Sequence, residues 1–275
     1  MAEREVLVAG VGMIPFTKPG QSERYDDMGR NAIVLAQKDA GISFDLIQQA
    51  YAGYVFGASC AGQRTVYKAG MSGIPIVNVN NNCSTGSAAL YLARQAVEGG
   101  AAECVLAVGF EQMEPGAICA KFPDRPTPYE AFDHLADELV GHAEIPLAIR
   151  YFGGAGLAHM KKYGTRIETF AKIRAKASRH AIHNPIAIFR KELTEEEVLA
   201  SPVIMHPVHR LMACPPTCGA AAAVLCSEEF ARHHDLQANV FIAAQAMTTD
   251  MPATFESGDM MQLVGYGMAK AAARQ

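Results

Sequence analysis

The chain has 275 residues, of which 50% are hydrophobic and 19% charged, and its formal net charge is −4. This length and composition are typical of one large or two modest domains of a soluble globular protein and exclude a disordered chain. The small, dispersed charge gives no basis for nucleic acid or an anionic membrane as the main partner, and no apolar run reaches the roughly 18 residues of a membrane span.

The first 111 residues alternate between strand-like and helix-like patterns. Short apolar runs predict strands at 5–13, 49–57, 74–80 and 103–111. Apolar residues at helical spacing predict a helix at 26–40, behind an Asp cap and closed by Gly41, and another at 85–100. This order predicts a layered α/β fold with a parallel-type sheet.

From about residue 115 the alternation of strands and helices stops. The following stretch is rich in proline, mixed charge and helical patterns, so we expect a mostly helical loop domain, 115–218, inserted into the sheet domain. A small-residue strand that runs into a Ser-capped helix at 219–234 and a further strand at 239–248 then resume the α/β pattern. We therefore expect an α/β core made of residues 1–114 and 219–250.

Seven cysteines are spread along the chain without a repeating spacing, at positions 60, 83, 104, 119, 214, 218 and 226. An odd count in a chain of this size indicates a reducing, cytoplasmic compartment rather than a disulfide framework. Cys214 and Cys218 form the one close pair, but they do not match zinc-ligand spacing, so we expect no metal site. We expect Cys104 and Cys226 in the core, and Cys60 on a loop, either as filler or near the site.

Cys83, in "NNNCSTGS", is the candidate nucleophile. It lies where a predicted strand ends and a predicted helix begins, with Ser84 or Thr85 available as helix caps and Gly86 allowing a ligand to approach closely. A helix N-terminus offers free amides and a partial positive charge, which favour the reactive thiolate. The alternative is a buried structural cysteine in a tight turn, and the local pattern alone leaves both open.

The histidines give no clear base for Cys83. His206 and His209 flank a proline, and His180 and His183 lie in a basic segment. A cysteine nucleophile usually needs a base, but none of these four has a spacing to Cys83 that the sequence can interpret. Surface or loop histidines account for them equally well.

A basic stripe follows one predicted helix of the inserted region. Residues 159–191 hold nine Lys and Arg against the single acid Glu168, and Lys172, Lys176 and Arg179 share one helical face. Such a stripe either holds a phosphorylated ligand or is an ordinary solvated face. The chain completes neither a G-x-G-x-x-G nor a P-loop motif, so we expect no permanently bound nucleotide cofactor.

The segment "VNVNNNCSTGSAALYLARQAV" resembles the nucleophile segment of thiolases, most closely the sterol-carrier-protein-2 (SCP-x) type. The resemblance extends in order along the whole chain, through "VLVAGVGMIPFTKPG", "AGYVFGASCAGQR", "GAAECVLAVGFEQM", "HMKKYGTRIETFAKI", "CPPTCGAAAAVLCSEEF" and "QAMTTDMPATFE".

The resemblance implies a thiolase-like layered fold of two similar α/β halves, with a loop domain inserted in the first half. It implies that Cys83 takes the acyl group of a 3-oxoacyl-CoA, in lipid or sterol side-chain metabolism, with coenzyme A or acyl-CoA as substrate rather than as a bound cofactor. It also implies a homodimer that pairs through the 74–80 strand and a loop domain that contacts coenzyme A, which favours a phosphate-facing role for Lys172, Lys176 and Arg179. In a eukaryote it implies a peroxisomal protein.

The sequence also departs from the family pattern. Family members are longer, and the GHP histidine, the C-x-G cysteine and the HDCF-type or NEAF-type segment of their second half have no counterpart here. Cys218 stands where many relatives carry Asp or Asn. We therefore interpret the chain as an N-terminal half plus loop domain, with 251–275 as the start of the second half.

This interpretation predicts little turnover unless a second subunit supplies the missing groups. Two alternatives stay open: an aldolase-like homologue that works with a partner subunit, and a non-catalytic binding or assembly module.

Overall fold

The computed structural model describes residues 4–115, 122 and 124–275. Contacts divide the chain into two compact units. The first, called the core unit below, joins Met1–Pro115 to Pro216–Met247, and the second, called the helical unit, joins Gly116–Pro215 to Thr248–Gln275. Each unit packs around hydrophobic clusters of its own.

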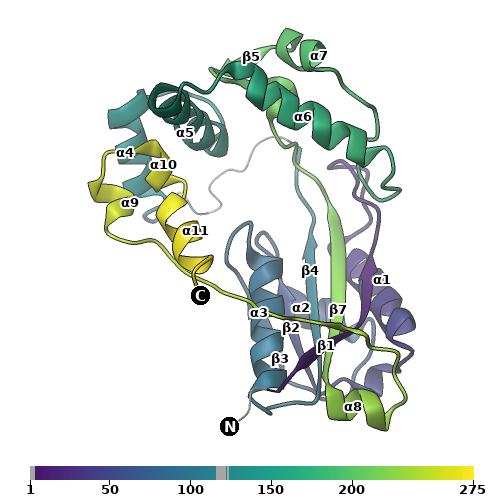
Figure 1. Cartoon of the computed structure of the whole chain (residues 1–275). Helices are drawn as coiled ribbons and strands as arrows, with labels where there is room; N and C mark the ends of the chain where they lie inside the picture. Colours follow the sequence, from purple (N-terminus) through teal and green to yellow (C-terminus); the bar gives the residue numbers. More distant parts are fainter. Residues whose placement is uncertain (1–3, 116–121, 123) are drawn as a thin grey trace. The chain divides into compact units, whose positions relative to one another are not determined.

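The core unit is built on a six-stranded sheet (Figure 1). Its strands are β1 (Val6–Met13), β2 (Gln49–Gly53), β3 (Ile76–Val79), β4 (Cys104–Glu111), β7 (Gly219–Ser227) and β8 (Val240–Phe241), in the order β3-β2-β4-β7-β1-β8. Three expected strands are clearly shorter than predicted: the one at 49–57 ends at Gly53, the one at 74–80 is Ile76–Val79, and the one at 239–248 has only two residues.

The sheet is mixed, so the expectation of a parallel-type sheet holds only for one part of it. Strands β3, β2 and β4 are parallel, whereas β7 runs antiparallel to both β4 and β1. The reason lies in the connection: the chain leaves the sheet at the end of β4 and returns at the same end, where Gly219 pairs with Glu111. A strand that re-enters there beside β4 must run in the opposite direction.

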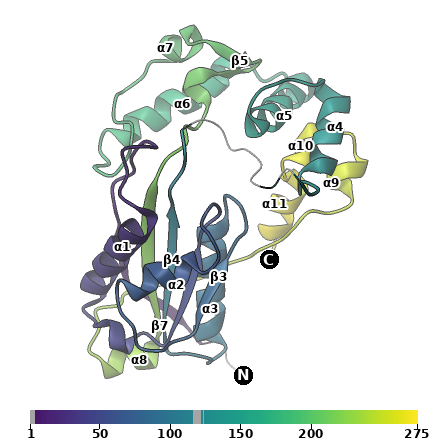
Figure 2. The same ribbon diagram turned by 180° about the vertical axis from the view of Figure 1, so that it is seen from behind.

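Helices cover both faces of this sheet. The helices α1 (Tyr25–Ala40) and α2 (Ala61–Tyr67) lie on one face and α3 (Thr85–Glu98) lies on the other (Figure 2), while α8 (Glu228–His233) follows β7. Helix α1 approaches β1 so closely that a Cβ at Gly12 would lie 2.2 Å from the carbonyl oxygen of Ala32. The expected Asp cap of α1 is wrong, because its N-cap is Arg24, whose side chain makes no capping hydrogen bond.

The helical unit packs around two small apolar clusters. Its elements are α4 (Glu130–Val140), α5 (Leu147–Tyr163), α6 (Ile167–Ala181), α7 (Glu195–Ala200), β5 (Val203–Met205), β6 (Val208–His209), α9 (Ala253–Glu256), α10 (Met260–Leu263) and α11 (Tyr266–Ala272). Met260 and Leu263 of α10 are buried against α4 and α5. Residues 251–275 thus pack within this unit, and their assignment to a second half stays a prediction.

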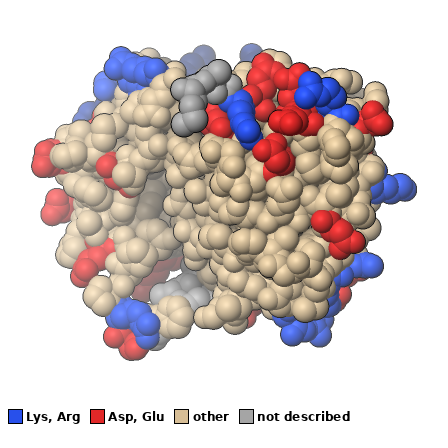
Figure 3. Space-filling model, turned by 90° about the horizontal axis from the view of Figure 1, so that it is seen from below, with Lys and Arg blue, Asp and Glu red and all other residues tan. Residues whose placement is uncertain are grey.

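On the face drawn in Figure 3, acidic and basic side chains are interspersed, and no large area carries charges of only one sign. Within the described residues, no helix combines the length and apolar character that crossing a bilayer requires.

Asp26, in the first turn of α1, is completely buried and is surrounded by cations. Its carboxylate lies 2.7 Å from Arg64 Nε, 3.1 Å from Lys68 Nζ and 3.3 Å from Arg24 Nε. Burial alone would raise the pKa of Asp26, but hydrogen bonds from Arg64 and Lys68 and the charges of Lys68 and Arg24 more than offset this and lower it from 3.8 to about 2. The cluster joins α1 to α2, because Arg64 and Lys68 lie on or directly after α2.

We predict that Asp26→Asn lowers the free energy of unfolding at pH 7 by about 2 kcal/mol. A carboxyl whose pKa is lower in the folded than in the unfolded state stabilises the fold above its unfolded pKa and loses this effect as the pH falls through its folded pKa. The difference between wild type and variant should therefore shrink between about pH 4 and pH 2, which urea titrations followed by circular dichroism can measure.

The matched control for this prediction is Asp27→Asn. Asp27 is the exposed neighbour that pairs with Lys68 at 2.5 Å, so its loss should cost less than about 1 kcal/mol. A loss in Asp26→Asn that stays constant down to pH 2 would contradict the prediction.

Candidate functional site

Cys83 lies in the turn between β3 and α3, and its side chain is exposed. Because β2, β3 and β4 are parallel, this turn lies at the edge of the sheet where all three strands end. Strand-to-helix turns at this edge are frequent positions for ligands and nucleophiles in α/β proteins. Cys83 is thus not buried, contrary to the structural alternative, and its role as a nucleophile stays a prediction.

The turn before α3 has a constrained backbone. Asn82 adopts a left-handed conformation with φ 50°, and both the amide and the hydroxyl of Ser84 donate to the carbonyl oxygen of Asn81, at 3.2 and 2.7 Å. Ser84 is the N-cap of α3, but its side chain makes no capping hydrogen bond. The expectation that Ser84 or Thr85 caps the helix is therefore wrong: both hydroxyl groups bind backbone atoms of the turn.

The first turn of α3 keeps free hydrogen-bond donors beside Cys83. Within the described part of the chain, the amides of Gly86 and Ser87 have no hydrogen-bond acceptor. The space where a Gly86 side chain would lie is open. Free amides at a helix N-terminus stabilise negative charge, so the turn can support a thiolate or an oxyanion.

The other cysteines have different surroundings. Cys104 and Cys226 lie opposite each other in the β4–β7 register and are fully buried, as predicted. Burial raises their pKa values to about 12 and about 11, with the charges of Cys226 and Glu103, respectively, adding to the effect. Cys60 is exposed at the N-cap of α2, with φ 63°.

Two cysteines, Cys214 and Cys218, lie near the position where the chain passes from the helical unit back into the core unit. Cys218, directly before β7, is buried, and its sulfur accepts a hydrogen bond from the Met113 amide at 3.2 Å. Cys214 is exposed. Cys119 lies outside the described residues.

The four histidines considered as bases all belong to the helical unit. His209 is buried, with Nδ1 2.8 Å from the carbonyl oxygen of Ser201, while His180, His183 and His206 are exposed. None of them is brought to Cys83 within the core unit. Their roles stay predictions.

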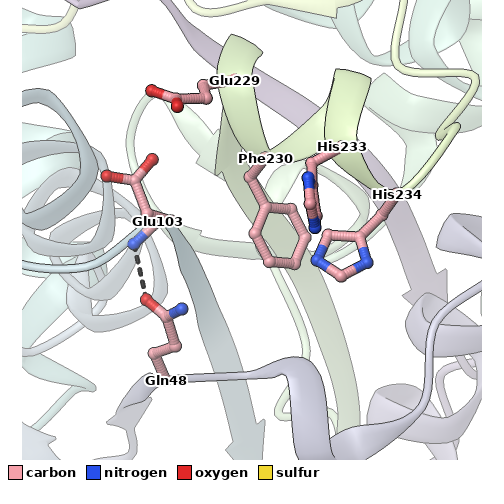
Figure 4. A pocket seen from close by; sticks show the side chains of 6 residues that line it. All are labelled: Gln48, Glu103, Glu229, Phe230, His233 and His234. Carbon is pink, nitrogen blue, oxygen red and sulfur yellow. Dashed lines mark hydrogen bonds between the residues drawn. The ribbon is translucent and has the colours of Figure 1, made fainter.

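The core unit has two histidines of its own, at the opposite end of the sheet from Cys83. His233 and His234 follow β7 on α8 and line a cavity of about 300 Å³ with Phe230, Glu229, Glu103 and Gln48 (Figure 4). Gln48 and Glu103 directly precede β2 and β4, whereas Cys83 follows β3, so the length of the strands separates the cavity from Cys83. This cavity is not the nucleophile site.

Lys172, Lys176 and Arg179 form an exposed stripe on α6. Within the described residues, none of the three forms an ion pair with an acidic side chain, since Glu168 of the same helix pairs with Arg166. The buried residues of the helix are Ala171, Ala175 and Ser178, so the stripe lies beside the packed face and points to solvent. Its three cations share one face, as predicted, and remain available to a ligand.

One neighbour of the Cys83 turn was not predicted. The Asn81 side-chain amide lies 3.8 Å from the sulfur of Met247, at the end of the segment that follows β8. The two residues are 166 positions apart, and no motif links them, so no sequence signal could have found this contact. Among the described residues, no group of three His, Cys, Asp or Glu side chains is arranged to hold a metal ion.

Comparison with known proteins gives consistent relatives. Residues 6–140 match the family model described as the N-terminal domain of thiolase. The chain is 48% identical over 274 residues to sterol carrier protein 2 of Oryctolagus cuniculus, covering 98% of this chain and 50% of the relative. It is 38% identical over 284 residues to non-specific lipid-transfer protein-like 2 of Caenorhabditis elegans, covering 98% and 68%.

Solved structures share the fold at low sequence identity. An Ltp2-ChsH2(DUF35) aldolase superposes with a TM-score of 0.72 at 22% identity, covering 94% of this chain and 63% of that one. Human mitochondrial 3-ketoacyl-CoA thiolase in complex with CoA gives 0.68 at 18% identity, covering 92% and 72%. The predicted thiolase-like layered α/β fold is confirmed, and the chain spans about half the length of the mammalian relatives it matches.

We predict that iodoacetamide separates the described cysteines into two classes. The exposed Cys60, Cys83 and Cys214 should be alkylated within minutes at pH 8, whereas the buried Cys104, Cys218 and Cys226 should react only after unfolding. Burial withholds access from all three, and for Cys104 and Cys226 it also disfavours the thiolate. Peptide mass spectrometry with and without urea measures this. Native labelling of Cys104 at the rate of Cys60 would contradict the core described above.

Proposed function

The chain belongs to the thiolase family, of the sterol-carrier-protein-2 type, and on this premise we propose that Cys83 is the nucleophile of an acyl transfer from a 3-oxoacyl-CoA. The observation that carries the proposal is the exposed thiol at the start of α3, on the edge where three parallel strands end. The relatives' names refer to sterol carriers and lipid transfer, which supports a lipid substrate.

The chemistry proposed for Cys83 is a retro-Claisen cleavage. The thiolate attacks the 3-oxo carbon and forms a C–S bond, and the carbonyl electrons move to oxygen. When that oxyanion collapses, the bond between C2 and C3 breaks, the acyl group stays on sulfur, and acetyl-CoA leaves as an enolate that takes up a proton. Coenzyme A then releases the acyl group from Cys83.

Besides the Cys83 thiol, the proposal uses hydrogen-bond donors of the turn and groups from outside this chain. The free amides of Gly86 and Ser87 are the donors next to the sulfur, and preorganised donors at a developing negative charge lower the barrier of acyl transfer. The family pattern implies a base and an acid/base cysteine in the second half of the longer relatives.

Coenzyme A is the proposed ligand of the basic stripe on α6. Its phosphates carry several negative charges, and Lys172, Lys176 and Arg179 are exposed cations on one helical face. The human thiolase that shares this fold was solved in complex with CoA, which supports the same ligand here. No bound cofactor other than this substrate is proposed.

Strand β3 is proposed to pair with β3 of a second copy. It is the edge strand of the sheet, and Val77, Tyr67 and Met71 near this edge are exposed apolar side chains. Unpaired backbone groups on such an edge favour pairing with another strand. Two copies related by a two-fold axis would continue the sheet across the interface.

We predict that incubation with acetoacetyl-CoA adds an acetyl group to Cys83, because the turn presents the thiol to solvent. The measurement is the mass of the peptide that contains Cys83, with loss of the added mass in hydroxylamine as evidence of a thioester. Cys83→Ala should abolish the label, and Cys60→Ala, which removes another exposed thiol, should retain it.

The outcomes of this experiment separate the candidate functions. An unlabelled Cys83 at millimolar acyl-CoA would contradict the acyl-enzyme proposal and favour the non-catalytic module. An unlabelled Cys83 in a chain that nevertheless cleaves a 3-hydroxyacyl-CoA would instead favour the aldolase-like alternative, whose fold is shared by the solved Ltp2-ChsH2(DUF35) aldolase.

We predict that Val77→Lys converts a dimer to a monomer, because it places a charge from each copy at the proposed β3–β3 interface. Light scattering coupled to size-exclusion chromatography measures the mass. The matched control is Val240→Lys on β8, the opposite edge strand, where the native side chain is 62% exposed, against 40% for Val77. An unchanged mass in Val77→Lys, or the same change in both variants, would rule out pairing at β3.

A further inference from the structure

Thr85 is the residue that holds the Cys83 turn from within. Its side chain is only 5% exposed, and its hydroxyl oxygen accepts a hydrogen bond from the Asn81 amide at 2.8 Å and donates to the Asn82 carbonyl oxygen at 2.6 Å. A hydroxyl has one proton and two lone pairs, so both bonds form at once. One side chain therefore connects the two residues before Cys83 to the helix after it.

The methyl group of Thr85 fixes the same residue to the sheet. A Cβ at Gly53, the last residue of β2, would lie 2.7 Å from Thr85 Cγ2 and 2.9 Å from the Thr85 carbonyl oxygen. Only a residue without a side chain permits this approach. The hydroxyl thus acts on the turn, while the methyl and backbone act on β2.

The hydroxyl of Thr85 is not used to begin the helix. Thr85 is the first residue of α3, and no side chain caps the helix at Ser84. The amides of the first turn at Gly86 and Ser87 remain free, so the hydroxyl satisfies the turn instead. It also supports Asn82 in its left-handed conformation, which a non-glycine residue adopts at an energetic cost.

We infer that Thr85 is a positioning residue, whose hydroxyl sets the orientation of the Cys83 thiol relative to the free amides of α3. The inference rests on the proposed role of Cys83 as a nucleophile. Without the hydroxyl, the Asn81 amide loses its acceptor and the Asn82 carbonyl keeps only the Thr85 amide, at 3.1 Å, as its donor. The turn then relaxes, and the sulfur moves away from the donors that stabilise negative charge.

The experiment compares two substitutions that divide the side chain. Thr85→Val keeps the branched shape and removes the hydroxyl. Thr85→Ser keeps the hydroxyl and removes the methyl group that packs against Gly53. The matched control is Thr65→Val in α2, where another completely buried hydroxyl donates to a backbone carbonyl, that of Ala61 at 2.9 Å, but does not contact the turn.

The readouts are the acylation rate of Cys83 by acetoacetyl-CoA, its alkylation rate by iodoacetamide, and the unfolding midpoint in urea. Thr85→Val should slow acylation about 10-fold and alkylation about threefold, in line with the loss of one or two hydrogen bonds. Thr85→Ser should stay within about twofold of wild type in both rates, although it loses packing, and Thr65→Val should leave both rates unchanged. Rescue by serine separates positioning from a general loss of stability.

Wild-type alkylation and acylation rates in Thr85→Val would overturn the inference, as would a loss in Thr85→Ser equal to that in Thr85→Val. If wild type is alkylated but never acylated, and Thr85→Val still slows alkylation, the positioning role stands and the proposed acyl transfer fails. Should Thr85→Val not fold by circular dichroism, Thr85→Ala, which also lacks the hydroxyl, takes its place under the same outcomes.

Discussion

The close approach of α3 to the end of β2 is the constraint on which the candidate site depends. The methyl group and carbonyl of Thr85 occupy the space that a side chain at Gly53 would need. A larger residue there would lift the first turn of α3 from the sheet and carry the preceding turn with it. Similarly, a Cβ at Gly109 of β4 would meet the Cα of Gly86 at 3.4 Å, so the helix start is seated across two strands. The position of Cys83 follows from this contact.

The same logic explains why the two ends of the sheet differ. At the end where β2, β3 and β4 stop, β3 turns into α3, and Cys83 is exposed in that turn. At the other end, β7 continues into α8 through the Ser227 cap, and Glu103 bonds to Ser227 and Arg4. These bonds lower the pKa of Glu103 and satisfy its carboxylate. The exposed Cys83 and the hydrogen-bonded Glu103 are therefore separated by the length of the strands.

The sequence predicted these features unequally, for physical reasons. Local signals were sufficient for β1, α1 with its Gly41 end, α3 and the buried Cys104 and Cys226, because apolar periodicity and turn residues act within a few positions. The antiparallel β7 could not be predicted from its own residues, since its direction depends on where a connection of about 100 residues returns. The roles of Ser84 and Thr85 were mistaken because a hydroxyl before a helix is usually a cap, and only the left-handed Asn82 diverts both groups to the turn.

A nucleophile that attacks a bulky thioester has to meet two demands that normally conflict. It has to be open to a large ligand, yet its atoms have to be held in one geometry, and exposed turns are generally the most mobile part of a domain. In this turn the groups that restrict motion are buried ones. They are the Thr85 hydroxyl and the close contact of Thr85 with Gly53. A further hydrogen bond joins β3 to α2, in which the Asn78 side chain accepts from the Gly62 amide at 3.0 Å. The outer side is left to the Cys83 thiol and the amides of Gly86 and Ser87. Rigidity is thus supplied by the buried contacts of this turn and access by its exposed side, which is the arrangement that acyl transfer at Cys83 would require.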